Sequence, residues 1–326
     1  VNNLLSKQTG KCYFRCVAEI QDIRLLWISS LTGDQFGLRA EAELIFGLHQ
    51  AGLHLEVVCG PDSRFVEEFQ SRGIPYSTDH PTGKWDLRET RRLRERLVQG
   101  RFTMVHAFNN KAIIHALRAS RGLNVKVLTY RGFAGHIHWY DPTSYLTHLH
   151  PRISGIWCLS EAVKDNMDRQ FLFRSPPTVR IYKGQDPAWY ENIEPLLRKE
   201  LGLKEETFAV VQVANYRKYK GVADLVAALR HIPEERPVEL VLVGRDLDHP
   251  RLERLIRDTP GQHRVHRLGF RKDVLRVVAA CDLAVNVSWT EALSKTLFEA
   301  IYLDVPCLAT AVSGNLEMIP DDDNGW

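Results

Sequence analysis

The sequence contains no apolar run close to the roughly 20 residues that a membrane-spanning helix needs. It also lacks a strong excess of charge. Its 43 Lys and Arg oppose 40 Asp and Glu, and a formal net charge of +3 argues against a nucleic-acid-binding protein. With 44% hydrophobic and 25% charged residues, the composition excludes disordered, collagen-like and low-complexity chains. The 326 residues are enough for two domains, each with its own core.

Cysteine is scarce, and its six positions are Cys12, Cys16, Cys59, Cys158, Cys281 and Cys307. Most of them lie inside apolar, strand-like runs, which indicates reduced, buried thiols rather than a disulfide framework. No His or Cys pair near Cys12 and Cys16 completes a zinc site. The N-terminus lacks the basic-then-apolar pattern of a signal peptide. We therefore expect a cytoplasmic protein; peripheral contact with the inner face of the membrane stays open.

From Ile23 onward, short apolar runs alternate with amphipathic stretches. Strands are expected at 25–28, 55–59, 103–107, 125–130 and 153–159, and then at 208–213, 238–243, 265–268 and 283–287. Strands that alternate with helices predict parallel sheets covered on both faces. The turn-forming stretch 183–189 separates the two series. We predict an α/β fold of two doubly wound Rossmann-like domains that face each other across a ligand cleft: an extension at 1–22 and domains at 23–185 and 186–326.

One predicted helix, 86–100, is dense in arginine, with Leu87, Leu93 and Leu97 as its expected buried stripe. We interpret it as a solvated helix with ion pairs between residues four apart. The alternative is a face that lies near anionic lipid or an acidic acceptor.

The stretch 289–300 carries two carboxylates, Glu291 and Glu299, across a predicted loop-to-helix junction. Ser294 is a candidate N-cap, which starts the helix near Lys295. The free amides of the first turn and the helix dipole suit a diphosphate. A carboxylate at Glu299 can accept hydrogen bonds from both hydroxyls of a ribose, and Glu291 can reach a sugar beyond the diphosphate.

These two glutamates, together with the segments 305–310 and 313–317, resemble the signature of the family 4 glycosyltransferases, which have the GT-B fold. The resemblance extends from about Ile23 to the last residue. It implies a retaining transfer of a sugar from a nucleotide-diphosphate sugar to a glycan or lipid-linked acceptor, without metal or other cofactor. It also implies an N-terminal acceptor domain, a C-terminal donor domain and a role in bacterial surface-polysaccharide or lipopolysaccharide assembly.

The resemblance assigns the donor sugar to Glu291 and the ribose to Glu299. The amides of Ala292, Leu293 and Ser294 would face the sugar and the diphosphate. Members of the family usually continue into helices that return to the first domain. Here the chain stops soon after a turn-like acidic stretch, so we expect the C-terminal domain to be truncated.

A second motif, 215–221, directly follows a predicted strand. The leaving diphosphate gains negative charge as the glycosidic bond breaks, and fixed cations can stabilise it. The family has an Arg and a Lys-Gly here. Lys220 matches, whereas Asn215 occupies the usual Arg position and Arg217 follows two residues later. We expect Arg217 and Lys220 to be catalytic, and we interpret Lys218 as a solvated loop charge.

Two glycine turns complete the expected donor site. Gly33 follows the first strand in a loop that is not a GxGxxG motif, and it lets the backbone approach the donor phosphates. Gly269 and Phe270 match the turn with which the family contacts the nucleobase.

The stretch 129–142 lies where the family often has a His near the reacting carbon, but Arg131 occupies that position. Arg131 would bind the donor phosphate or an acidic acceptor, and His136 or His138 would replace the imidazole. With Trp139 these histidines form the expected acceptor region. We expect no metal site from the four histidines of this region, which are His136, His138, His148 and His150.

Three alternatives remain. Asp246 and Asp248 match the metal-binding motif of the other glycosyltransferase fold, and we interpret this match as chance. A GT-B nucleotide-sugar 2-epimerase would share the architecture but need no acceptor. A non-catalytic sugar-nucleotide-binding protein is favoured by the departures at Asn215 and Arg131. The sequence identifies neither the nucleobase, the sugar nor the acceptor.

Overall fold

The computed structural model describes residues 22–33, 35–172, 175–312 and 314–319. The chain divides into two compact units. The first unit is Val1–Leu159 with Lys164–Gly184, and the second is Ser160–Val163 with Gln185–Trp326. Apart from Asp22, the predicted N-terminal extension lies outside the described residues. The boundary between the two units lies after Gly184, and the sequence predicted this boundary after residue 185.

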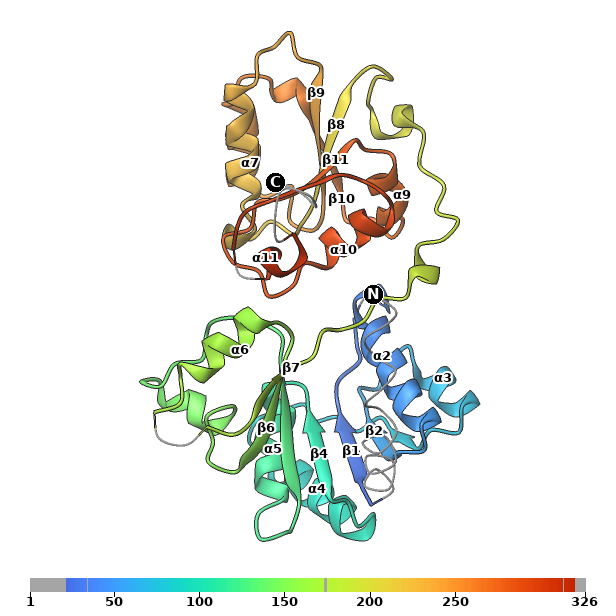
Figure 1. Ribbon diagram of the computed structural model, residues 1–326, viewed down its shortest axis with the longest axis vertical. Helices are drawn as coiled ribbons and strands as arrows, with labels where there is room; N and C mark the ends of the chain where they lie inside the picture. Colours follow the sequence, from blue (N-terminus) through green and yellow to red (C-terminus); the bar gives the residue numbers. More distant parts are fainter. Residues whose placement is uncertain (1–21, 34, 173–174, 313, 320–326) are drawn as a thin grey trace, which may run out of the picture. The chain divides into compact units, whose positions relative to one another are not determined.

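The first unit is built on a seven-stranded parallel sheet in the order β3-β2-β1-β4-β5-β6-β7 (Figure 1). Its strands are β1 Arg24–Ile28, β2 His54–Val58, β3 Tyr76–Ser77, β4 Met104–Ala107, β5 Lys126–Arg131, β6 Ile153–Cys158 and β7 Thr178–Arg180. The α-helices that begin in this part of the chain are α2 Gln35–Gln50, α3 Val66–Ser71, α4 Leu87–Gln99, α5 Asn110–Ala119 and α6 Glu161–Asp168.

Both faces of this sheet are buried. Leu25 and Trp27 of β1 pack into a cluster with the side chains of α2 and α3, whereas Leu26 and Ile28, which are fully buried, point to the opposite face. Successive side chains of a strand alternate between faces, so a strand buried on both sides is apolar at every position. This explains why β1 lacks the polar alternation of a half-exposed strand.

Helix α4 corrects one expectation. Leu87 is 73% exposed, because it is the first residue of the helix and lies ahead of the stripe that packs through Leu93 and Leu97. Arg96 pairs with Glu56 (3.0 Å) and Asp79 (3.2 Å), which belong to other elements of the first unit. The interpretation of a solvated helix with ion pairs four residues apart is therefore wrong for Arg96, which ties α4 to the sheet.

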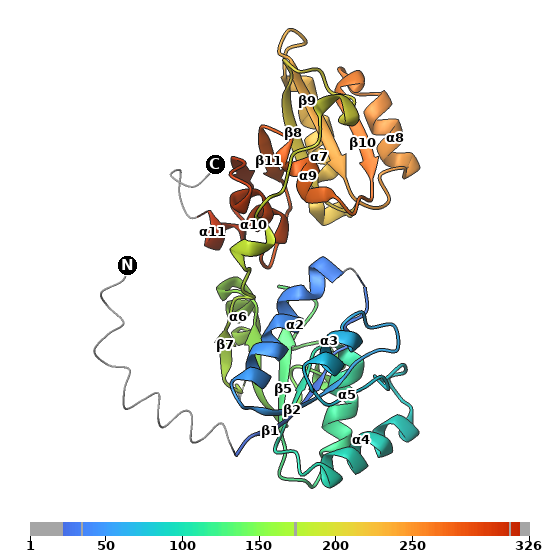
Figure 2. The ribbon, with the colours of Figure 1, turned by 90° about the vertical axis from the view of Figure 1, so that its right-hand side faces the viewer.

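The second unit has a five-stranded parallel sheet in the order β10-β9-β8-β11-β12 (Figures 1 and 2). Its strands are β8 Phe208–Val213, β9 Val238–Val243, β10 Val265–Gly269, β11 Leu283–Asn286 and β12 Cys307–Ala309. Its helices include α7 Val222–Ala228, α8 Pro250–Arg257, α9 Val274–Ala279, α10 Lys295–Tyr302 and α11 Asn315–Met318.

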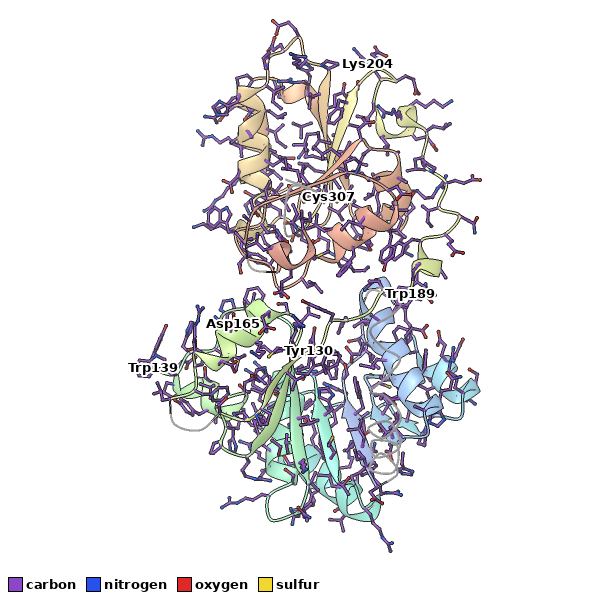
Figure 3. All side chains as sticks on the ribbon, viewed as in Figure 1. Tyr130, Trp139, Asp165, Trp189, Lys204 and Cys307 are labelled. Carbon is purple, nitrogen blue, oxygen red and sulfur yellow. The ribbon has the colours of Figure 1, made fainter. Side chains whose placement is uncertain are left out.

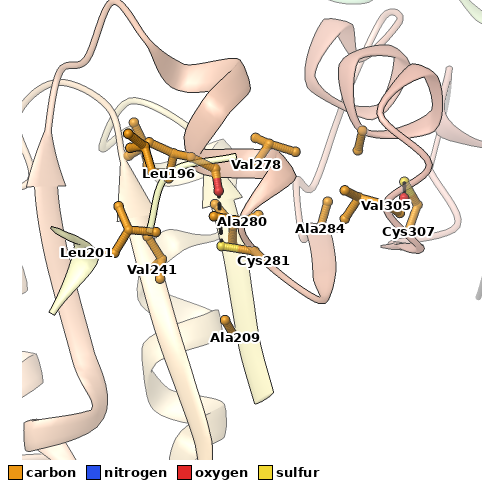
Figure 4. Close-up of a cluster of buried hydrophobic side chains, with 14 of the residues drawn as sticks. Leu196, Leu201, Ala209, Val241, Val278, Ala280, Cys281, Ala284, Val305 and Cys307 are labelled. Atoms are coloured by element: carbon orange, nitrogen blue, oxygen red, sulfur yellow. Dashed lines mark hydrogen bonds between the residues drawn. The ribbon is translucent and has the colours of Figure 1, made fainter. Parts of the chain in front are cut away.

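The core of the second unit gathers Leu196, Val241, Cys281 and Val305 (Figure 4). The Cys281 thiol donates to the Val277 carbonyl at 3.3 Å, and burial raises its pKa to about 12. The prediction of buried, reduced thiols is confirmed for the four described cysteines, which are Cys59, Cys158, Cys281 and Cys307.

The strand order reverses direction once in each sheet, between β1 and β4 in the first unit and between β8 and β11 in the second. Open α/β sheets bind ligands outside the carboxyl ends of their strands at such switch points. The predicted fold class, two doubly wound Rossmann-like domains, is confirmed. None of the helices in the described ranges combines the length and the hydropathy that crossing a bilayer requires.

Candidate functional site

The switch point of the second unit holds a direct contact between the two predicted motifs. The Lys220 ammonium lies 2.6 Å from a carboxylate oxygen of Glu291, 71 residues further along the chain. Lys220 belongs to the loop after β8 and Glu291 to the loop after β11, and these strands are neighbours. The Ser288 hydroxyl donates to the same carboxylate oxygen at 3.1 Å. The parallel crossover thus brings one cation and one anion, each largely buried, to the carboxyl edge of the sheet.

The backbone around Lys220 explains why the motif ends in glycine. Gly221 has a φ of +66°, and a Cβ there would lie 2.0 Å from the carbonyl oxygen of Val287. The Gln212 side-chain amide donates to the Lys220 carbonyl at 2.9 Å. Only glycine allows this left-handed, close approach, which presses the β8 loop onto the end of β11.

Helix α10 starts where the sequence predicts. Ser294 is its N-cap and accepts from the Leu297 amide at 3.4 Å, while the Asn286 side chain donates to the Ser294 hydroxyl at 2.7 Å. Glu299 is only 4% exposed and pairs with Lys295 at 2.9 Å. Glu299 is therefore a buried, paired carboxylate one turn inside the helix rather than a surface residue.

The loop between Glu291 and Ser294 is held by a segment to which the sequence assigned no separate role. The Gly314 amide donates to the Glu291 carbonyl at 2.9 Å. A Cβ on Gly314 would lie 1.8 Å from the Ala292 carbonyl oxygen. Ala292 is buried and Leu293 is partly buried. The family-like glycine at 314 thus fixes the backbone whose amides were predicted to face the donor.

Arg217 is placed differently from Lys220. Its guanidinium is 2.5 Å from the carboxylate of Asp246, and its side chain is 53% exposed. The Asn215 side-chain oxygen accepts from the Arg245 amide at 2.9 Å, and the Arg245 guanidinium lies 4.2 Å from the centre of the Phe270 ring. Asp246, one half of the Asp-x-Asp pair, therefore serves as an ion-pair partner, and Arg245 is a cation that sequence reasoning missed.

The sequence feature that could have pointed to Arg245 is the glycine directly before it, Gly244. Gly244 directly follows β9 and has a φ of +156°, and a Cβ there would lie 2.1 Å from the Ala214 carbonyl oxygen. Its amide donates to the Gly269 carbonyl at 2.9 Å. Gly269 has a φ of +66° and open space around it, and Phe270 next to it is 48% exposed. The ends of β8, β9 and β10 are thus drawn together.

The sequence also gave no indication of a role for Trp289 in this site. Its indole N–H donates to Asp224 at 2.7 Å, its backbone amide donates to the Tyr219 carbonyl at 2.8 Å, and the Lys218 ammonium lies 5.4 Å from its ring. The tryptophan therefore joins the two motif loops, and Lys218 is a neighbour of an aromatic ring rather than a solvated charge alone.

The remaining predicted residues lie in the first unit. Gly33 follows β1 with a φ of +129° and open space around it. Arg131 ends β5, donates to the Gly135 carbonyl, and its Nε is buried with no hydrogen-bond partner among the described residues. Burial lowers the pKa of Arg131. This arginine points into its own loop, which the sequence did not anticipate.

The predicted acceptor region is an aromatic loop that packs on itself. His136 stacks on Phe133 (ring centres 5.3 Å apart) and His138 on Tyr140 (5.0 Å). Trp139 is 48% exposed and points away from the first unit (Figure 3). In the described part of the chain, no three His, Cys, Asp or Glu side chains gather as a metal site requires.

Two family descriptions match the chain. "Glycosyltransferase Family 4" matches residues 42–189, and "Glycosyl transferases group 1" matches residues 194–326. Together they span most of both units.

Characterised proteins match shorter stretches. N-acetyl-alpha-D-glucosaminyl L-malate synthase of Bacillus anthracis is 31% identical over 166 residues, which cover 51% of this chain and 42% of that protein. Lipopolysaccharide glucosyltransferase WaaG of Escherichia coli is 32% identical over 154 residues, or 46% of this chain and 40% of that protein. The chain thus matches about two fifths of the length of these relatives.

Solved structures share the fold. HepE of Anabaena, crystallised with UDP and glucose, superposes with a TM-score of 0.73 at 22% identity, covering 93% of this chain and 85% of that chain. A glycosyltransferase of Rickettsia africae superposes with a TM-score of 0.75 at 18% identity, covering 93% and 83%. These likenesses concern the architecture.

Proposed function

Because the chain belongs to the family 4 glycosyltransferases of the GT-B fold, we propose that it transfers a sugar from a nucleotide-diphosphate sugar to a glycan or lipid-linked acceptor. The transfer retains the anomeric configuration and uses no metal ion. The contact between Lys220 and Glu291 at the β8–β11 switch point carries this proposal, because it brings together the cation proposed for the phosphate and the carboxylate proposed for the donor sugar.

The second unit supplies what the departing diphosphate needs. As the bond between the sugar carbon and the phosphate oxygen breaks, charge develops on that oxygen, and a fixed cation and helix amides stabilise it more than the ground state. Lys220 is this cation, and the first turn of α10 presents the amides. Glu299 accepts hydrogen bonds from the ribose hydroxyls. Arg245, over Phe270, adds positive charge beside the nucleobase turn.

The acceptor oxygen attacks on the face that the phosphate leaves. A carbon–oxygen bond to the acceptor forms as the bond to phosphate breaks, and the acceptor proton passes to the released phosphate oxygen. Leaving and attacking groups thus share one face of the sugar, and the configuration is retained. Glu291, held by Lys220 and Ser288, orients the sugar hydroxyls during this step.

Two relatives support the choice of substrates. HepE is described in complexes with UDP-glucose and with UDP and glucose, which favours a nucleotide-sugar donor. The E. coli relative is a lipopolysaccharide glucosyltransferase, which favours a role in surface-polysaccharide assembly. We place the protein in the cytoplasm, with peripheral contact to the inner membrane.

A donor screen tests the proposal. Thermal unfolding is followed with UDP, GDP and ADP and with their glucose conjugates, since a ligand that binds only the native state raises the melting temperature. One nucleotide and its sugar should do so, with or without EDTA. Slow hydrolysis of that donor should release the sugar in its original anomeric form, as read by NMR before mutarotation. No stabilisation by any nucleotide, or release of the inverted sugar, would overturn the proposal.

The same samples separate the alternatives. A nucleotide-sugar 2-epimerase would convert the donor to its epimer without an acceptor. A non-catalytic binding protein would be stabilised by the donor and leave it intact.

A further inference from the structure

An apolar groove of about 520 Å³ lies on the first unit, on the face of the sheet that carries Leu25 and Trp27 of β1. Helix α2 contributes Leu44 and Leu48 to its lining, and the edge strand β7 contributes Val179. Among the described residues, no Lys, Arg, Asp or Glu lines it. The groove therefore offers hydrophobic contact rather than polar recognition.

The side of the groove formed by β7 is open to solvent. Val179 is 51% exposed, and Ile181, which follows directly after the strand and also lines the groove, is 49% exposed. Apolar side chains left in water forgo the free energy that burial provides. A contiguous exposed apolar surface marks a place where another segment or molecule packs. An apolar partner would thus complete this face of the first unit.

The chain itself enters the groove ahead of β1. Ile23 lines the groove and directly precedes this strand. Residues 1–21, which lie outside the described residues, are joined to Ile23 through Asp22. This stretch is therefore tethered at the groove. A short tether gives a segment an effective concentration on the order of millimolar, so weak contacts are enough to hold it.

The tethered stretch carries an apolar stripe at helical spacing. Four apolar residues recur at i, i+3, i+4 and i+7, which is the pattern of one face of an amphipathic helix: Tyr13, Cys16, Val17 and Ile20. Three charged residues, each four positions from the next, fall on the other face: Lys11, Arg15 and Glu19. An uncharged groove accepts the apolar face and leaves the charged face in water.

We propose that residues 13–20 bind in this groove of the same chain, with their apolar stripe against α2 and β7. Chemistry and reach both support the assignment. The lining carries no charge and its open side exposes apolar side chains, and the segment joined to it carries an apolar face. The contact completes the hydrophobic packing of this face. It does not depend on the proposed transferase function, because the groove lies outside the donor site of the second unit.

Thiol trapping tests the contact, because Cys16 lies in the proposed segment. Val179→Cys adds a thiol on the open side of the groove, and Val98→Cys adds one on α4, which does not line it. The two valines are matched, with exposures of 51% and 55%. In a Cys12→Ser background, mild oxidation should join Cys16 to the thiol of the first variant about tenfold faster than to that of the second.

Mass spectrometry of unreduced peptides from the intact chain measures the two rates. The four described cysteines are buried, which keeps them from competing. Equal rates at the two positions would overturn the proposal. A disulfide found only between two chains would also overturn it, and would assign the groove to a second copy.

Charges placed in the segment give a second readout. Val17→Asp/Ile20→Asp puts carboxylates on the apolar stripe, and an uncharged groove excludes them. Fluorescence of bis-ANS bound to the uncovered groove should rise about threefold. Lys11→Gln/Arg15→Gln lowers the net charge equally on the other face and should leave the fluorescence unchanged.

The fluorescence has its own contrary outcomes. An unchanged signal in the aspartate variant, or an equal rise in the glutamine variant, would contradict the contact. Near-UV circular dichroism shows whether each variant keeps its fold. If the aspartate variant does not, the two trapping rates decide the question.

Discussion

In both units, polar residues lie at the switch point of a parallel sheet, but the charged side chains at the two points differ in their ion pairing. At the β8–β11 switch point, Lys220 is paired with Glu291, and Glu299 with Lys295. At the β1–β4 switch point, the loops that follow β1, β2, β3 and β4 enclose a polar hollow of about 700 Å³. Lys84 and Lys111 line this hollow and have no ion-pair partner among the described residues. An ion pair holds Lys220 in a fixed position, whereas no such pair fixes the ammonium groups of Lys84 and Lys111.

The units also differ in how the chain assembles their sites. Two short motifs, each followed by a helix or a glycine turn, supply most of the second unit's site. The hollow of the first unit needs four loops and the buried supports Glu89 and His115. Short motifs can be recognised in a sequence, whereas loops that are positioned by distant buried side chains cannot.

The largest expected effect comes from breaking the charge pair of the second unit. Lys220→Ala should lower kcat about 10²- to 10³-fold, because the leaving diphosphate loses its fixed cation. Steady-state kinetics with the donor from the screen measure it. Lys218→Ala is the matched control and should stay within a few-fold of the unchanged protein. A Lys220→Ala enzyme with normal kcat would show that the pair is only structural.

The next effect comes from moving the backbone that carries Glu291. Gly314→Ala places a Cβ 1.8 Å from the Ala292 carbonyl oxygen, so the loop must shift. We expect the free energy of unfolding of the second unit to fall by about 3 kcal/mol and UDP to bind more weakly. Urea denaturation and calorimetry measure the two. Gly47→Ala in α2, with nothing near its Cβ, should instead raise stability slightly. Equal effects of the two variants would contradict the proposed support.

Acid should affect the first unit before the second. Burial lowers the pKa of His106 to about 3 and that of His148 to about 3, with smaller contributions from Lys183 and Arg131. The unfolded chain binds these protons below about pH 6.5 and the folded chain does not, so stability falls as the pH decreases from 6.5 towards 3. At pH 5 each histidine should cost about 2 kcal/mol.

Hydrogen exchange at pH 7 and pH 5 measures this loss separately in each unit. The double variant His106→Gln/His148→Gln should show a flatter pH dependence in the first unit. An unchanged dependence would mean that other groups cause the acid sensitivity.

The smallest effect separates the two roles of Asn109. Asn109→Ala removes the N-cap of α5 and should cost the first unit about 1 kcal/mol. Asn109→Asp keeps an oxygen for the Ala112 amide but cannot donate to His80. It should preserve the free energy of unfolding of the first unit, as read by urea denaturation. Equal loss of stability in both variants would show that the contact with His80, and not the cap, supports the loop.

Some features could be predicted because their signals are local. The N-cap at Ser294 and the start of α10 follow from residue types within one turn of the chain. The expectation for Leu87 was wrong because periodicity alone does not say which turn of a helix meets a neighbour. The pairing of Arg217 with Asp246, 29 residues away, depends on which loops the sheet places side by side.

By itself, the sequence determined the alternation of strands and helices, the N-cap of α10 and the family that the motifs indicate. Only the tertiary structure decided which charges are paired and which remain available. Hydrophobic periodicity and capping act over a few residues, whereas strand order is set by packing of the whole sheet. That order brings the β8 loop to the β11 loop and closes four separate loops around Lys84 and Lys111.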